Sequence, residues 1–154
     1  MSESSKKVFL IGPGYIGLEV LDRLLEAGYK VTTLVRRQEA AAELKQKPNV
    51  EVVMGTIDDS DLITQQTADH DIVIHTATAD HLPSVQAVIK GIEQRAAKDK
   101  HTIYIHTSGC SFLSDDSHGA YGSDKIYKDT DPADLDARPD TSSHRGIDLS
   151  LIHI

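Results

Sequence analysis

The sequence predicts an α/β fold, a doubly wound parallel sheet with a layer of helices on each face. Short apolar runs alternate along the chain with segments in which apolar residues recur at helical spacing. The chain has 154 residues, of which 39% are apolar and 26% are charged, and this size and balance fit one globular domain. We therefore expect a three-layer α/β/α domain over residues 1–154.

The first strand, turn and helix are the clearest of these elements. Val8 to Ile11 is a continuous apolar run, which is typical of a strand buried on both faces. Three glycines follow, and a helix is then expected to continue as far as Gly28. The apolar positions at helical spacing are Ile16, Val20, Leu21, Leu24 and Leu25.

The same alternation continues through four more strands. They are expected at 31–35, 50–54, 71–75 and 102–106, with helices at 39–46, 60–66 and 83–98 between them. From Ser108 to Arg145 the residues are small, polar and acidic, which predicts a long loop with short helical pieces. Asp148 to Ile154 is expected to form a sixth strand, at an exposed edge of the sheet.

The charge argues against nucleic acid and anionic membrane surfaces as partners. The formal net charge is −8 at pH 7, and such a surface repels phosphates. The late acidic residues are expected to be a solvated surface, with a face that binds a protein partner as the alternative. They are Asp115, Asp116, Asp124, Asp129, Asp131, Asp134 and Asp136.

The sequence contains neither a membrane span nor a pair of cysteines. Its apolar runs are far shorter than the roughly 18 residues that a spanning helix needs. Cys110 is the single cysteine, so no intrachain disulfide forms, which fits a reducing compartment. We expect a cytoplasmic protein in which Cys110 is a small buried apolar residue rather than a catalytic thiol.

The glycines of the first turn match a phosphate-binding pattern. Gly12, Gly14 and Gly17 have the spacing G-x-G-x-x-G between a strand and a helix. In that pattern the first glycine permits the turn, the second lets the backbone approach a pyrophosphate and the third lets helix and strand pack closely. The motif therefore predicts a dinucleotide site at the helix N-terminus, with a tight turn alone as the alternative.

The end of the second expected strand favours one dinucleotide over the other. An acid there would bind the free ribose hydroxyl of NAD, whereas an arginine accommodates the 2′-phosphate of NADP. Arg36 and Arg37 occupy this place and no acid does. We expect NADP as the cofactor, with NAD possible if these arginines only solvate the start of a helix.

Two histidines follow neighbouring strands of the expected sheet. His75 and His106 end the segments "IVIH" and "IYIH", so we expect them to lie side by side. No cysteine accompanies them, and no second histidine stands at the spacing of a zinc-binding helix. The sequence therefore predicts polar residues lining the cofactor crevice and no metal site.

Five short motifs follow the five expected strands: "IGPGYIG", "LVRR", "GTIDD", "HTAT" and "HTSG". With these motifs the chain resembles the short-chain dehydrogenase/reductase superfamily, and more narrowly its atypical or extended members, the NAD-dependent epimerase/dehydratase-like and NmrA-like proteins. The resemblance implies a Rossmann fold that binds NAD(P) over residues 1–154. It also implies that most of the usual C-terminal substrate-binding segment is lacking after Ile154.

The resemblance assigns further residues to the cofactor. It implies that Asp58 lies beside the adenine. It places Tyr15 and Ile16 with the glycines of the first turn. The residues expected next to the middle of the cofactor are Thr76, Ala77 and Thr78.

The resemblance also implies catalytic residues. Ser108 corresponds to the serine that polarises the substrate, and Tyr121 and Lys125 in "YGSDK" correspond to the Tyr-x-x-x-Lys pair. A lysine ammonium stabilises a tyrosinate, so such a tyrosine exchanges a proton with a substrate oxygen. Gly119 and Gly122 flank Tyr121, and glycines disfavour the helix that would bring positions four apart together.

Two classes of function remain open from the sequence. The first is an NADP-preferring oxidoreductase or epimerase/dehydratase-like enzyme that acts on a small carbonyl or hydroxyl substrate. The second is a non-catalytic NAD(P)-binding regulator or redox sensor that contacts a protein partner, or an inactive truncated member of the family. The sequence sets no oligomeric state.

Overall fold

The computed structural model describes residues 6–114, 117–128 and 130–152 of the chain. The chain folds into two compact units, Met1–Thr107 and Ser108–Ile154. The expected single domain over residues 1–154 stays a prediction. Among the described residues, no helix has both the length and the apolar composition that a bilayer-crossing helix needs.

The first unit is built on a five-stranded parallel sheet with the strand order β3-β2-β1-β4-β5. Its neighbouring strands pair in parallel, and His75 pairs with His106 where β4 and β5 end, as expected from the sequence. The strands are β1 (Lys7–Ile11), β2 (Lys30–Val35), β3 (Val50–Met54), β4 (Ile72–His75) and β5 (Ile103–His106).

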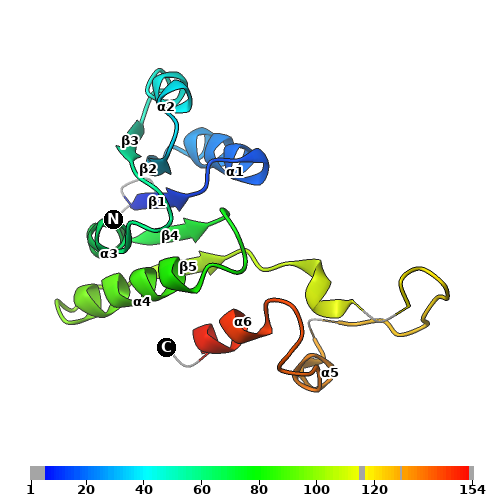
Figure 1. The fold of residues 1–154 in the computed structure, drawn as a ribbon. Helices are drawn as coiled ribbons and strands as arrows, with labels where there is room; N and C mark the ends of the chain where they lie inside the picture. The colour runs from blue at the N-terminus through cyan, green and yellow to red at the C-terminus, as the bar shows by residue number, and fades with distance from the viewer. Residues whose placement is uncertain (1–5, 115–116, 129, 153–154) are drawn as a thin grey trace. The chain divides into compact units, whose positions relative to one another are not determined.

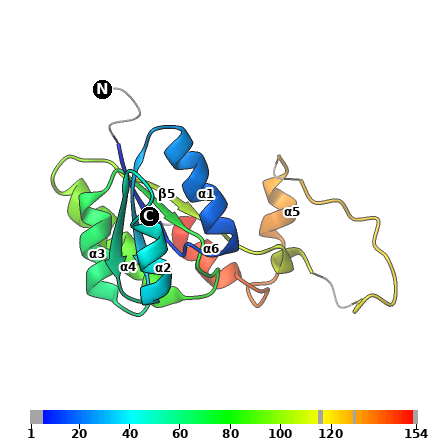
Figure 2. The same cartoon turned by 90° about the horizontal axis from the view of Figure 1, so that it is seen from above.

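Helices cover both faces of this sheet, so the predicted doubly wound α/β fold is confirmed (Figure 1). Figure 2 shows α3 and α4 on one side of the sheet and α1 on the other. The helices are α1 (Tyr15–Glu26), α2 (Gln38–Leu44), α3 (Ser60–Asp69) and α4 (Leu82–Ala96).

Two apolar cores, one on each face, hold these layers together. Successive residues of β1 point to opposite faces, so Val8 and Leu10 join one core, whereas Phe9 and Ile11 join the other. All four side chains are fully buried. This is why the first apolar run reads as continuous rather than alternating.

The strand order places a topological switch between β1 and β4. From β1 the chain proceeds through β2 to β3 on one side, and it then crosses to the other side of β1 to form β4. Ligands of open α/β sheets bind outside the carboxyl ends of the strands at such a point. The loops that follow β1 and β4 are therefore where a ligand is expected.

The second unit contains η2 (Cys110–Leu113), α5 (Pro132–Asp136) and α6 (Arg145–Ile152). The expected sixth strand at 148–154 is wrong, because its described residues lie in α6, while 153–154 lie outside the described part. Ile147 and Leu151 stand four apart, a spacing that suits a helix face, and the His144 carbonyl accepts from the amides of Ile147 and Asp148. The short apolar run from Asp148 thus fits the period of a strand as well as that of a helix, and in the structure it forms the helix that starts after His144.

Candidate functional site

A cavity of about 470 Å³ opens at the carboxyl ends of β1 to β4. It lies at the switch point, and each of these four strands contributes the loop that follows it. The lining residues are Gly12, Pro13, Gly14, Leu34, Val35, Arg36, Arg37, Ala40, Gly55, Thr56, Ile57, Asp58, Thr76 and Ala77.

The three glycines of the first turn have different surroundings. Gly12 has φ +95°, and a Cβ there would lie 2.5 Å from the backbone of Ala77. A Cβ on Gly17 would collide with the carbonyl oxygen of Gly12. A Cβ on Gly14 would meet nothing within 4 Å. Gly12 and Gly17 are thus needed for the turn itself, whereas Gly14 leaves open space at the cavity wall.

The N-terminus of α1 faces this turn without a side-chain cap. Gly14 is the N-cap residue, it makes no side-chain cap hydrogen bond, and the first helical turn contains no acid. The first amides of a helix have no partner within the helix and carry a partial positive charge. The amides of Tyr15, Ile16 and Gly17 are therefore suited to bind an anion such as a pyrophosphate.

Thr76 holds the β4 loop against the glycine turn. Its amide donates to the Ile11 carbonyl at 2.8 Å, and its hydroxyl donates to the Gly12 carbonyl at 2.7 Å. The next residue, Ala77, is exposed and lines the cavity. Thr78 is outside the lining residues, and its hydroxyl accepts from the Asp80 amide at 3.2 Å.

Two exposed arginines form the wall after β2. Arg36 and Arg37 both line the cavity, and Arg37 is the N-cap residue of α2. The lining contains one acid, Asp58, which comes from the loop after β3. The wall that follows β2 is therefore positively charged.

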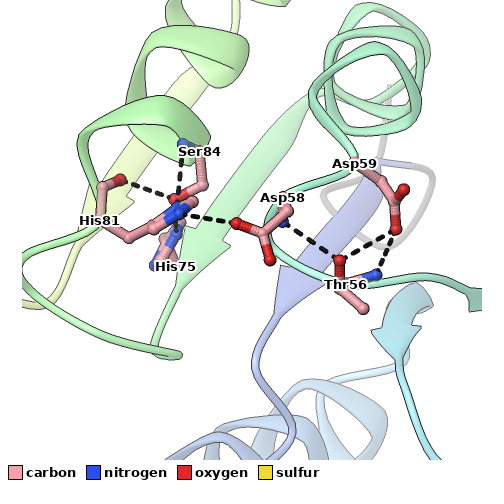
Figure 3. Close-up of polar contacts among 6 residues, drawn as sticks. All are labelled: Thr56, Asp58, Asp59, His75, His81 and Ser84. Carbon is pink, nitrogen blue, oxygen red and sulfur yellow. Dashed lines mark hydrogen bonds and ion pairs between the residues drawn. The ribbon is translucent and has the colours of Figure 1, made fainter.

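Asp58 lies in a loop whose backbone is fixed by its neighbour. The Asp59 carboxylate accepts from the amide and the hydroxyl of Thr56, at 2.6 and 3.1 Å, and the Thr56 hydroxyl accepts from the Asp58 amide at 3.2 Å (Figure 3). Asp59 thus shapes the loop, while the carboxylate of Asp58 remains available to the cavity.

A histidine from the start of α4 contacts Asp58 on its other side. His81 Nε2 lies 3.1 Å from Asp58 Oδ1, and His81 Nδ1 accepts from the Ser84 amide at 3.2 Å (Figure 3). The Ser84 hydroxyl donates to the His81 carbonyl and lies 2.9 Å from His75 Nε2. Burial, helped by the nearby His106 and His81, lowers the pKa of His75 to about 4.

The structure gathers most of the predicted cofactor residues around one cavity. Gly12, Gly14, Arg36, Arg37, Asp58, Thr76 and Ala77 line it, whereas Tyr15, Ile16, Gly17 and Thr78 do not. Tyr15 is 97% exposed, so its ring is not packed against the turn. The sequence motifs did not assign to the cofactor the further lining residues Pro13, Leu34, Val35, Ala40, Gly55, Thr56 and Ile57. The signal that could have found them is their position, because they lie at the end of a strand, in the loop that follows it or in the first turn of the next helix.

The predicted catalytic residues lie in the second unit and are not gathered there. Tyr121 is 65% exposed in a segment without helix, and Lys125 Nζ is 2.6 Å from Asp134 Oδ1. The hydrogen bond to Asp134 raises the pKa of Lys125. Ser108 is exposed, and its hydroxyl donates to Asp148 Oδ2 at 2.9 Å. A catalytic role for these three residues stays a prediction.

The second unit instead places a histidine beside the loop that contains Ser108. His144 Nε2 lies 2.6 Å from Ser111 Oγ, and a Cβ on Gly109 would touch the His144 ring. His144 has φ +68° and immediately precedes α6, whose first turn contains Asp148. No sequence motif pointed to His144, because 33 residues separate it from Ser111.

Other predictions concern cysteine, metals and acids. Cys110 is exposed, so its expected burial is wrong, since the short η2 helix leaves it on the surface. Among the described residues, no three His, Cys, Asp or Glu side chains form a group that could hold a metal ion. Within the acidic stretch, Asp115, Asp116 and Asp129 lie outside the described residues.

Known sequences resemble the chain, one of them over nearly all of its length. A family model described as NAD(P)H-binding matches residues 12–137. The chain is 38% identical over 156 residues to the oxidase ucsJ of an Acremonium species, which covers 96% of this chain and 44% of the oxidase. It is 42% identical over 72 residues to an uncharacterized protein of Schizosaccharomyces pombe, covering 46% of this chain and 24% of that protein. The chain thus spans less than half the length of these relatives.

Solved structures share the fold. A short-chain dehydrogenase/reductase of Veillonella parvula, in complex with NADP, has a TM-score of 0.58 at 16% identity, covering 70% of this chain and 49% of that one. A putative epimerase of Bacteroides thetaiotaomicron has a TM-score of 0.52 at 22% identity, covering 66% and 46%. The chain therefore belongs to the NAD(P)H-binding family and has the Rossmann fold of short-chain dehydrogenases/reductases.

Proposed function

We propose that the chain binds NADP in the cavity at the switch point, in preference to NAD. The observation that carries this proposal is the wall of the cavity, where the uncapped N-terminus of α1 adjoins two exposed arginines after β2. The helix amides suit the pyrophosphate, and guanidinium groups suit the 2′-phosphate. The NADP complex of the Veillonella parvula protein supports a cofactor in this fold.

Parallel titrations with NADP and NAD test this preference. In the Arg36→Ala and Arg37→Ala variants the dissociation constant for NADP is expected to rise by about tenfold, and that for NAD by much less, because only NADP has the extra phosphate. Arg23→Ala is the control, since Arg23 pairs with Glu19 and Glu26 on α1 and does not line the cavity. Equal affinities of the unaltered chain for NADP and NAD would refute the preference.

The proposed chemistry is oxidoreduction of a small carbonyl or hydroxyl substrate, with epimerase/dehydratase-like chemistry as a related outcome. The oxidase relative and the dehydrogenase/reductase fold support this class. A reduced nicotinamide, when bound, supplies the hydride that forms the new C–H bond. The residues of the chain then have two tasks: the Ser108 hydroxyl turns from Asp148 to donate its hydrogen bond to the carbonyl oxygen, and an acid gives that oxygen a proton as the C=O π bond opens. Solvent returns the proton to the acid.

Two residues are candidates for this acid. Tyr121, which stands four residues before Lys125 in the sequence, is the residue that the family resemblance implies. His144 is favoured by the contacts within the second unit, where Ser108 contacts Asp148 and Ser111 contacts His144. Histidine is the most common general acid in proteins.

Two substitutions distinguish these acids. Tyr121→Phe removes only a hydroxyl, and His144→Asn keeps a residue that tolerates the left-handed backbone. The variant that lacks the true acid is expected to lose about 10²-fold in turnover while keeping its cofactor affinity. Turnover that survives in both variants would rule out both residues as the acid.

A non-catalytic regulator or redox sensor is the second candidate function. The observation that favours it is the pairing of Lys125 with Asp134, which turns the expected lysine toward an acid. In this case the chain binds NADP but oxidises or reduces no substrate in a broad carbonyl and alcohol panel. Its partner would then be another protein, and its location is proposed to be the cytoplasm.

A further inference from the structure

We propose that His81 is a positioning residue that holds the Asp58 carboxylate for recognition of the adenine amino group. The chain then selects dinucleotides with adenine over those with hypoxanthine. This inference rests on the proposed function, because it concerns the base of the same bound dinucleotide.

The order of chemical groups along the cavity places the base near Asp58. The α1 amides suit the pyrophosphate and the arginines after β2 suit the ribose phosphate, so the base extends toward the loop after β3. Apolar side chains that suit the faces of a flat ring, Leu34, Ala40 and Ile57, also line the cavity. Asp58 is the one acid in this lining.

A carboxylate and adenine are complementary at the base edge. An ionised carboxylate only accepts hydrogen bonds, and the 6-amino group of adenine donates them. Hypoxanthine has a carbonyl oxygen at the same position. That oxygen and a carboxylate both only accept hydrogen bonds, so the two cannot pair. A fixed carboxylate therefore discriminates between the two bases, whereas a freely rotating one discriminates less.

The hydrogen bonds of His81 determine how it meets Asp58. Because His81 Nδ1 accepts from the Ser84 amide, the ring proton of the neutral imidazole is on Nε2 and donates to Asp58 Oδ1. The Asp58 side chain is 80% exposed and the His81 side chain only 22% exposed. The sheltered imidazole thus restrains a carboxylate that otherwise extends into solvent.

His81 is itself held in place from behind. The Ser84 hydroxyl donates to the His81 carbonyl at 2.9 Å, and its oxygen lies 2.9 Å from Nε2 of the fully buried His75. Figure 3 shows these contacts leading from His75 through Ser84 and His81 to Asp58. The end of β4 and the start of α4 thereby fix the imidazole, which in turn orients a carboxylate from the loop after β3.

The experiment compares the binding of NADP with that of its hypoxanthine analogue. For the unaltered chain we expect about tenfold tighter binding of NADP, the size of one hydrogen bond to a charged group. In His81→Asn the asparagine still caps α4 by accepting from Ser84, but it is too short to reach Asp58. This variant is expected to keep the melting temperature and to lose most of the preference.

Three further variants separate positioning from stability. His81→Ala removes the cap as well, so it is expected to lose the preference and also to melt at a lower temperature. Asp58→Asn is expected to abolish the preference for NADP although His81 is unchanged, because this variant lacks the carboxylate. Asp61→Asn is the charge-matched control, because Asp61 is exposed in the first turn of α3 outside the cavity lining. It is expected to keep the full preference.

Several outcomes would overturn the inference. If the unaltered chain binds both dinucleotides equally, or if His81→Asn or Asp58→Asn keeps the full preference, then His81 and Asp58 do not select the base, although the proposed NADP site stands. If the unaltered chain binds neither dinucleotide, the proposed function fails and this inference fails with it. If His81→Asn does not fold, the preference of His81→Ala decides, and a full preference in that variant overturns the role of His81.

Discussion

Gly14 and Gly17 belong to the same turn, yet the space around them differs. A Cβ on Gly17 collides with the Gly12 carbonyl, whereas a Cβ on Gly14 meets open space beside the cavity. Gly17 is thus required by packing, and Gly14 is required only if a ligand approaches the backbone closely. Alanine substitutions at the two positions therefore report on different properties.

We predict that Gly14→Ala costs less than about 1 kcal/mol of unfolding free energy, the scale of a change at an N-cap. Its affinity for NADP is nevertheless expected to fall at least about tenfold, because the methyl group occupies the pyrophosphate space. Gly17→Ala is expected to cost about 1 to 3 kcal/mol through overpacking. Denaturant unfolding and calorimetric titration measure both quantities, and an unchanged affinity of Gly14→Ala would contradict the site.

His75 makes the stability of the first unit sensitive to acid. Burial lowers its pKa to about 4 in the folded chain, whereas an unfolded histidine titrates near 6.5. Between these pH values the unfolded chain binds a proton that the folded chain does not, so the unfolding free energy decreases as the pH falls.

We predict that His75 alone accounts for a loss of about 3 kcal/mol between pH 6.5 and pH 4. Burial also lowers the pKa of His70, which adds to the loss in the same direction. Chemical unfolding of the unaltered chain and of His75→Gln across this pH range measures the difference. Parallel pH profiles for the two proteins would show that His75 is not responsible.

At the level of elements, α3 and α4 pack closely at a glycine. A Cβ on Gly91 would lie 2.5 Å from Thr67 Cβ and 2.6 Å from the Thr64 carbonyl oxygen. The Thr64 hydroxyl donates to the Ala87 carbonyl at 3.0 Å, which ties the two helices together one turn earlier in α4. Gly91 therefore sets how near the helices approach each other.

Gly91→Ala is expected to destabilise the chain by about 1 to 3 kcal/mol, although alanine is the better helix former, because the added methyl group overpacks this contact. Gln86→Ala, at an exposed position of the same helix, is the matched control and is expected to change stability by less than about 0.5 kcal/mol. Thermal or denaturant unfolding tests the pair, and a stabilised Gly91→Ala would contradict the packing described.

The sequence predicted helices and strands well where the pattern of buried apolar residues fits only one kind of element. The five strands of the first unit are apolar runs between turns, so a parallel sheet was the natural interpretation. The segment from Asp148 onward was misassigned because a short apolar run suits either period, and α6 depends on contacts with His144. Local pattern alone did not specify that helix.

The same limit applies to the candidate site. The glycines, the arginines and Asp58 stand directly after strands, so their gathering at one edge followed from the predicted topology. His81 and His144 contact partners 23 and 33 residues away in the sequence. Such side-chain contacts depend on how loops and helix ends are placed, which the sequence pattern does not encode.

At the scale of the whole molecule, two of the hollows in the described part of the first unit lie at opposite ends of its strands. The cavity of about 470 Å³ lies at the carboxyl ends. A wider groove of about 870 Å³ lies at the amino ends and is lined among others by Lys7, Lys30, Lys98 and Lys100. Positively charged side chains line both the cavity and the groove, so electrostatic attraction for a phosphate does not distinguish the two sites. The α1 N-terminus belongs only to the first.

Amide NMR of the labelled chain during titration with NADP tests the central claim most directly. We predict saturable shifts in the amides of Tyr15, Ile16 and Gly17, accompanied by Arg36 and Arg37, with the lysine-lined groove unchanged. Shifts confined to the amides around Lys7 and Lys30, or no shifts at millimolar NADP, would contradict a dinucleotide site at the carboxyl ends of the strands.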